Sequence, residues 1–217
     1  MKTCFHTTWL VLSLVLLLGL AGCSPEPTEA VPPTPTPIES YMAALSEPLT
    51  VDGSDTEYPA APFELGGVMV HLAHDGERLY VHARSEVDGW IAIGFNQAGG
   101  GMNGANMILG FAEGSGQAVR NDRGTGHGHQ QVPTSGILDS VVTHSDGIII
   151  LEFSYPMEFP ANAGFSLPGL AAGEEYSLIV ATHSRSGDFS QKHSSQSRTN
   201  FSVGNGNSKP TPGGSGY

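Results

Sequence analysis

Cysteine is almost absent from this sequence of 217 residues, which contains two, Cys4 and Cys23. Cys4 lies in an apolar N-terminal segment typical of an export signal, and Cys23 directly follows that segment. The rest of the chain has no thiol. Disulfides, thiolate metal sites, iron–sulfur clusters, cysteine nucleophiles and haem attachment through Cys-x-x-Cys-His are therefore excluded, so any haem would have to be bound non-covalently.

Positive charge is also scarce. The chain has 9 Lys and Arg residues against 21 Asp and Glu residues, a formal net charge of -12 at pH 7. Nucleic acid is a poor partner for such a chain, because phosphate binding needs clustered Lys and Arg. The acidity favours solubility and is compatible with a basic protein partner, without requiring one.

Signatures of common enzyme classes are missing. The sequence has no Gly-x-Ser-x-Gly nucleophile elbow. Its glycine-rich stretches at 99–104 and 114–116 lack the strand-turn-helix setting that phosphate-binding loops require. These absences leave little support for an enzyme of a common class.

The N-terminus predicts export. Met1 and Lys2 precede an apolar run from Trp9 to Leu20, which is short for a membrane span of about 20 residues. The run closes on "LAGC", which resembles the lipobox of bacterial lipoproteins. We therefore predict a lipoprotein signal peptide over residues 1–22 and a lipid on Cys23, which would attach the protein to the outer membrane of the cell envelope, facing the periplasm or the cell surface. An ordinary signal peptide with a chance cysteine is the alternative.

Composition divides the exported part into three segments. Residues 23–48 are rich in Pro and Thr and predict an extended tether, although "IESYMAALSE" within them is compatible with a short helix ended by Pro48. Residues 204–217 are rich in Gly, Ser and Pro and predict a disordered tail. Residues 49–203 are long enough for one domain with a hydrophobic core.

The domain has the period-two pattern of β-strands. In "VMVHLAHDGERLYVHA", Asp75-Gly76 predicts a two-residue hairpin turn, which would pair Leu72 with Leu79 and Val70 with Val81. Further short strands are expected at "WIAIGF", "ANMILGF", "IIILEFSY", "YSLIVATHS" and "TNFSV". The pattern predicts an all-β antiparallel sandwich with a core of Val70, Leu72, Leu79, Val81, Ile91, Ile93, Ile149, Leu151 and Phe153.

Several of these stretches carry a family resemblance. Along the chain lie "DGWIAIGFNQAGGGMNGANMILGF", "QAVRNDRGTGHGH", "GIIILEFSYPM" and "YSLIVATHSRSGDFSQKHSSQSRTNFSV". They contain a Gly-Trp-x-Ala-x-Gly strand, a Met-x-Gly-Ala-x-Met step, an Asp-Arg pair and a late histidine, in that order. This series resembles a DOMON domain, related to the haem b cytochrome domain of cellobiose dehydrogenase. The resemblance covers about residues 49–203 and implies an immunoglobulin-like sandwich of two sheets.

The resemblance also implies a cofactor and its ligands. In the cytochrome branch of the family, haem b is held by a methionine and a histidine, which fall on Met102 and His193 in this sequence. His183 is the alternative histidine. Such a fully coordinated iron suits electron transfer and not catalysis at the metal. In the competing interpretation, Met102 covers the core as Met107 is expected to do, and His193 is an ordinary solvated side chain.

Other histidines give weaker signals. His127 and His129 are two residues apart, so in an extended segment they would share one face and could hold Cu²⁺ or Zn²⁺ with a third ligand. His71 and His82 are expected diagonally on one face of the predicted hairpin, as ordinary polar positions.

Three functions follow from these signals. The first is an exported, lipid-anchored protein that binds haem b and passes electrons between separate redox proteins. The second is a haem-free module that binds a sugar or another small ligand, because members of this family differ in their ligands. The third is a histidine-based metal carrier.

Overall fold

The computed structural model describes residues 41–205 except Ser115. The predicted signal peptide, Cys23, the tether up to residue 40 and the tail from residue 206 lie outside the described residues. Among the described residues, no helix is long and apolar enough to cross a membrane.

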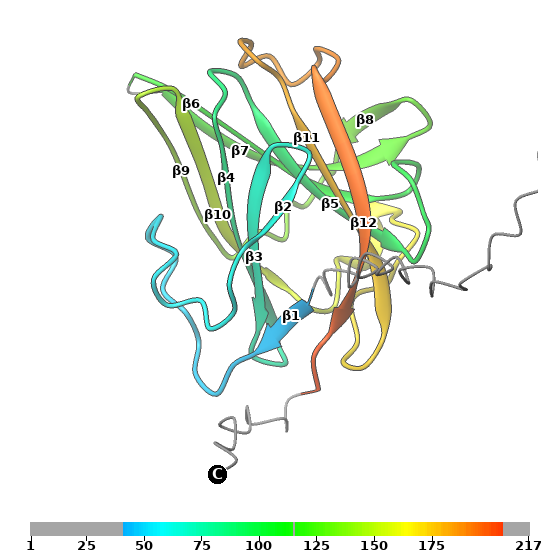
Figure 1. Ribbon diagram of the computed structural model, residues 1–217. Coiled ribbons are helices and arrows are strands. Elements are labelled where there is room, and N and C mark those ends of the chain that lie inside the picture. The colour runs from blue at the N-terminus through cyan, green and yellow to red at the C-terminus, as the bar shows by residue number, and fades with distance from the viewer. Residues whose placement is uncertain (1–40, 115, 206–217) are drawn as a thin grey trace, which may run out of the picture. The chain divides into compact units, whose positions relative to one another are not determined.

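The described residues form an almost entirely β structure (Figure 1). One short 3-10 helix, Ala161–Ala163, accompanies the strands. The strands are β1 (Tyr41–Ala44), β2 (Phe63–Leu65), β3 (Val68–His74), β4 (Arg78–Ser85), β5 (Ile91–Gln97), β6 (Asn106–Glu113), β7 (Gly116–Thr125), β8 (Gly128–Gln131), β9 (Asp139–Ser145), β10 (Ile148–Pro156), β11 (Glu175–Thr182) and β12 (Ser195–Val203).

The strands form two layers. The first, which we call the β5 sheet, has the order β8-β7-β6-β5-β11-β12. The second, the β4 sheet, has the order β3-β4-β10-β9 with β2 beside β3. All pairs within each sheet are antiparallel. The predicted antiparallel sandwich is therefore confirmed.

Strand β1 joins the two sheets along one edge. Its first half pairs with β12 and its second half with β3, both in parallel (Figure 1). Residues 41–44, expected in the tether or in a short helix, are thus part of the fold, which begins before the expected boundary at residue 49. Met42 explains the difference, because its fully buried side chain belongs to the core.

The core lies between the sheets and follows the period-two rule. On β5, Ile91, Ile93 and Phe95 face the core, while Ala92 and Gly94 face outward. All nine predicted core residues belong to this cluster, with at most 3% of any side chain exposed.

The turn between β3 and β4 differs from the prediction. Asp75 pairs with Arg78, so Gly76 and Glu77 form the tip, and Gly76 has a φ of 95°. The Asp75 carboxylate fixes this turn by accepting hydrogen bonds from the backbone N–H groups of Glu77 and Arg78, at 2.9 and 2.7 Å.

The shifted turn corrects the register of the hairpin. Leu72 lies opposite Val81, and not opposite Leu79. Because the register changes by two residues, the core face is preserved. His71 and His82, expected on a diagonal, lie directly opposite each other.

Candidate functional site

The outer face of the β5 sheet carries an apolar cluster of its own. Small residues such as Ala92 and Ala181 alternate along the strands with large core residues, which leaves a shallow floor on this face. The cluster consists of Trp90, Ala92, Ala105, Met107, Leu109, Ile179, Ala181 and Phe189, with Met102 and Phe111 packed against it. Met107 therefore packs on the outer face and not in the central core, because it alternates with Ile108.

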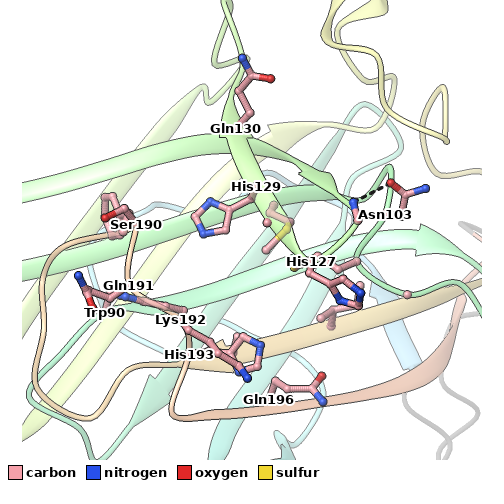
Figure 2. Close-up of a pocket in the computed structure, with 18 of the residues that line it drawn as sticks. Trp90, Asn103, His127, His129, Gln130, Ser190, Gln191, Lys192, His193 and Gln196 are labelled. Carbon is pink, nitrogen blue, oxygen red and sulfur yellow. Dashed lines mark hydrogen bonds between the residues drawn. The ribbon is translucent and has the colours of Figure 1, made fainter.

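A pocket of about 1400 Å³ lies over this floor. Its walls come from the β5–β6 loop, the β7–β8 hairpin, the β11–β12 loop and β12 itself. Figure 2 shows the hairpin residues His127 and His129 near His193 of the β11–β12 loop. Small-molecule pockets usually measure roughly 300–1,000 Å³, so this one has room for a large ligand.

Among the described residues, the pocket lining contains cations but no acidic residue, although Arg120 is paired with the buried Asp122 behind the lining. Its lining, all of it in the described part of the chain, includes Arg120, Lys192 and Arg198 and no Asp or Glu. The whole chain has only 9 Lys and Arg residues and a formal net charge of -12. Such a local excess of positive charge favours a ligand that carries negative groups.

Met102 lies in the lining, on a loop that the fold holds firmly. The amide of Asn96 donates hydrogen bonds to the carbonyl oxygens of Gly101 and Asn103, at 2.6 and 2.9 Å. Gly124 of β7 packs so closely that a Cβ there would collide with the Met102 carbonyl oxygen. The thioether is thus presented from a fixed backbone, partly buried against the apolar cluster.

His193 lines the same pocket from the β11–β12 loop. Partial burial, together with the nearby charges of Lys192 and His129, lowers the pKa of His193 below its usual value. The lowered pKa favours the neutral imidazole, which is the form that binds a metal ion. The structure thus brings Met102 and His193, the two predicted ligands, to one pocket.

His183 lies behind Trp90, with the two ring centroids 6.1 Å apart. It is not part of the pocket lining. Its Nδ1 accepts hydrogen bonds from the backbone N–H groups of Arg185 and Ser186, at 3.1 and 2.9 Å. Of the two candidate histidines, only His193 lines the pocket that also contains Met102.

The pocket contains a polar network that the sequence interpretation missed. The fully buried Asp122 accepts two hydrogen bonds from the Arg120 guanidinium, each 2.7 Å long, and one from Nδ1 of His129. The guanidinium also lies 4.9 Å from the ring centroid of Phe189. This network fixes the β7–β8 hairpin against the β11–β12 loop and leaves His129 Nε2 for a ligand. Asp122 belongs to the Asp-Arg pair of the family resemblance, but its contacts with Arg120 and His129 were not predicted.

The predicted histidine pair, His127 and His129, lies at the same pocket. His127 is exposed in the turn of the β7–β8 hairpin, and His129 is partly buried at the start of β8. Both belong to the lining. The pair therefore contributes to the pocket that contains His193 and does not form a separate site on an exposed strand.

Three solved structures illustrate the similarity to known proteins. The cytochrome b domain of pyranose dehydrogenase from Coprinopsis cinerea is 16% identical, with a TM-score of 0.46 over 62% of this chain and 74% of that chain. The cytochrome domain of Myriococcum thermophilum cellobiose dehydrogenase is 14% identical, with a TM-score of 0.44 over 66% and 77%. A family 9 carbohydrate binding module from Caldicellulosiruptor kristjanssonii, in complex with cellotriose, is 9% identical, with a TM-score of 0.49 over 80% and 98%.

Sequence comparison identifies the family. Among curated proteins, no sequence matches this chain. The family model of the DOMON domain matches residues 67–183, which include β3 to β11 and Met102, while His193 lies beyond the matched residues. Because the match covers more than half of the 217 residues, this chain belongs to the DOMON domain family.

Proposed function

We propose that the domain binds haem b in the pocket on the β5 sheet, with Met102 and His193 as the ligands of the iron. The observation that carries this proposal is that both residues line one pocket although they come from loops 91 positions apart in the sequence. A neutral thioether and a neutral imidazole suit haem iron, and the described residues contain no thiolate that could replace them.

The rest of the pocket fits the same cofactor. The apolar floor of small side chains suits a flat macrocycle. Lys192 and Arg198, which line the pocket, suit the two propionate groups, which are anionic at neutral pH. The buried indole Nε1 of Trp90, in the pocket lining, has no hydrogen-bond partner among the described residues and could donate to such a ligand.

The function that follows is electron transfer. When bound, haem iron accepts and releases single electrons. Met102 and His193 would hold the iron, and ligation by two protein side chains suits electron transfer and not catalysis at the metal. The donor and the acceptor would be separate redox proteins.

Haem titration of the purified chain tests the proposal. The wild type is expected to bind one equivalent and to give a low-spin spectrum. His193→Ala should abolish stable binding or give a high-spin spectrum, whereas His183→Ala, the matched control, should leave the spectrum unchanged. His129→Gln tests the other partly buried histidine of the pocket. If His183 or His129 is essential and His193 dispensable, the assignment of the histidine ligand is wrong.

The alternative function is a haem-free binding module. The observation in its favour is the presence of Trp90 and of the amide side chains of Gln130, Gln191 and Gln196 in the lining, since aromatic and amide groups also suit a sugar. This function predicts a colourless protein that refuses haem and gains thermal stability with a sugar. Uptake of one haem equivalent would contradict it.

We also propose that a lipid on Cys23 attaches the domain to the cell envelope. The support is the "LAGC" sequence and the Pro/Thr-rich segment that follows it. Cys23→Ser should move the protein from the membrane fraction to the soluble fraction or leave it as an unprocessed precursor. Identical fractionation and migration of the two proteins would contradict the anchor.

A further inference from the structure

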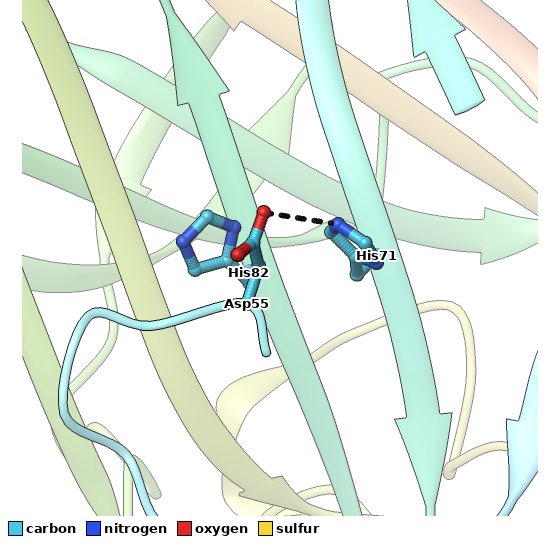
Figure 3. Close-up of side chains that lie close together, drawn as sticks. All are labelled: Asp55, His71 and His82. Atoms are coloured by element: carbon cyan, nitrogen blue, oxygen red, sulfur yellow. Dashed lines mark ion pairs between the residues drawn. The ribbon is translucent and has the colours of Figure 1, made fainter. Parts of the chain in front are cut away.

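A second group of ligating side chains lies on the opposite side of the sandwich, on the outer face of the β4 sheet. His71 of β3 and His82 of β4 are directly opposite each other, with ring centroids 5.8 Å apart. Asp55, from the loop that crosses this face, places its carboxylate between the two rings in Figure 3. One ligand atom from each residue lies within 4.8 Å of the others.

Backbone contacts define which nitrogen of each ring is available. Nδ1 of His71 lies 3.1 Å from the carbonyl oxygen of Ala60, and Nε2 of His82 lies 3.3 Å from that of Gly53. A carbonyl oxygen only accepts, so each of these nitrogens carries the proton. The lone pairs are then on Nε2 of His71 and Nδ1 of His82.

Among residues 41–205, apart from Ser115, no hydrogen-bond donor reaches either of these two nitrogens. Nε2 of His71 lies 3.6 Å from the Asp55 carboxylate, which is itself an acceptor when ionised. Nδ1 of His82 has no hydrogen-bond partner among the described residues, although the side chain is only 3% exposed. Three electron-pair donors are thus gathered where a cation would satisfy them.

The surroundings resemble the outer shell of a metal site. Histidine ligands in proteins usually donate their second N–H to a carbonyl or carboxylate, which orients the ring. Here the carbonyls of Ala60 and Gly53 do so. The Tyr58 ring packs against both imidazoles, with its ring centroid 5.2 Å from that of His71 and 6.1 Å from that of His82.

We propose that His71, His82 and Asp55 bind one divalent transition-metal ion. Two imidazole nitrogens and one carboxylate oxygen suit Zn²⁺, Cu²⁺, Ni²⁺ or Fe²⁺, and do not suit Ca²⁺ or Mg²⁺, which prefer oxygen ligands alone. The half-exposed Asp55 side chain provides the entry path. The site is separate from the pocket on the β5 sheet and does not depend on haem.

Titration with Zn²⁺ tests the proposal. The full chain is first treated with a chelator, and binding is then measured by calorimetry and by the shift in melting temperature. We expect one equivalent to bind tightly and to raise the melting temperature. Titration with Co²⁺ should give an absorption spectrum typical of mixed nitrogen and oxygen ligands.

Variants locate the ion. His82→Gln should abolish this binding, and Asp55→Asn, a change in an exposed loop residue that should not impair folding, should weaken it by at least about tenfold. His144→Gln is the matched control, because His144 also lies beside a carboxylate, 3.3 Å from Asp88. It should leave Zn²⁺ binding unchanged, as should the double change His127→Gln and His129→Gln.

Two outcomes would overturn the proposal. One is a wild-type chain that binds neither Zn²⁺ nor Co²⁺ at millimolar concentration. The other is binding that survives Asp55→Asn and His82→Gln but is lost in the double variant of His127 and His129. That result would place the ion in the pocket on the β5 sheet.

Discussion

The two sheets present opposite kinds of outer face. The outer face of the β5 sheet is open, with a pocket of about 1400 Å³ whose lining includes Lys192, Arg198 and Arg120, the last of these paired with the buried Asp122. The outer face of the β4 sheet is covered by residues 45–62, which we call the cover segment. The fully buried Glu152 of β10 holds that segment by accepting hydrogen bonds from the backbone N–H groups of Asp52 and Gly53 and from the Tyr58 hydroxyl, at 2.9, 2.6 and 3.1 Å.

Side-chain size and polarity explain the difference. On the β5 sheet the outward positions include Ala92 and Ala181, which leave space. On the β4 sheet they include His82 and Glu152, which are large and polar and need partners once water is excluded. The cover segment supplies those partners. The same period-two alternation therefore produces a binding surface on one sheet and a second, partly polar core on the other.

The largest loss of stability is expected from detaching the cover segment. Glu152→Leu removes the acceptor of one buried and two partly buried hydrogen bonds, which leaves their donors unpaired and should lower the free energy of unfolding by about 2–4 kcal/mol. Urea denaturation measures this change, and proteolysis near residue 55 should accelerate. Glu64→Leu, at an exposed position of β2, is the control and should have little effect. Equal stability of the two variants would contradict the role of Glu152.

A matched pair of substitutions distinguishes the two faces directly. Ala73 is fully buried beneath Tyr58 and Tyr80 on the β4 sheet, so Ala73→Phe should overpack the covered face and cost about 1–3 kcal/mol. Ala181→Phe places the same ring in the floor of the pocket, where there is room for it. It should cost less stability and abolish haem uptake. Denaturation and haem titration of both variants check the pair, and the opposite pattern would contradict the comparison.

A smaller effect on stability, with a clear spectroscopic change, is expected at Met102. Because Met102 is only partly buried, Met102→His should change the free energy of unfolding by less than about 1 kcal/mol. Haem bound by two histidines should remain low-spin but have a lower reduction potential, since thioether ligation raises the potential. Redox titration measures the shift. An unchanged potential in a haem-loaded variant would exclude Met102 as a ligand.

The smallest effect on stability is expected from Asp75, whose carboxylate fixes the turn between β3 and β4, and it depends on pH. Partial burial acts to raise the pKa of Asp75, but hydrogen bonds from the backbone N–H groups of Arg78 and Glu77 and from Tyr80 outweigh it, so the pKa lies below the usual 3.8. The ionised carboxylate therefore stabilises the fold above about pH 4, and this contribution is lost as the pH falls through the folded-state pKa.

Asp75→Asn tests this contribution. The amide oxygen can still accept the backbone hydrogen bonds, so the loss at neutral pH should be below about 1 kcal/mol. Urea midpoints at about pH 7 and about pH 3 should differ less in the variant than in the wild type. An identical pH dependence in both proteins would show that Asp75 does not stabilise the turn through its charge.

The sequence by itself determined the parts of the fold that depend on neighbouring residues. Alternation of large apolar and small or polar side chains identified the strands around Val70, Ile93 and Phe153 and their core faces, because burial of one face of a strand repeats every two residues. The family resemblance placed Met102 and His193 as partners, and the structure brings both to one pocket. Their role as ligands stays a prediction.

Only the tertiary structure decided what depends on distant segments. Strand β1 was missed because its four residues gain stability from pairing with β12 and β3, which local pattern does not reveal. The burial of Asp122 in the pocket network and of Glu152 beneath the cover segment likewise depends on residues far along the chain. The register of the β3–β4 hairpin depends on hydrogen bonds to the Asp75 carboxylate, and only that register places His71 opposite His82. Side-chain alternation fixes which face a residue occupies, but the opposing partner is set by turn geometry and long-range packing.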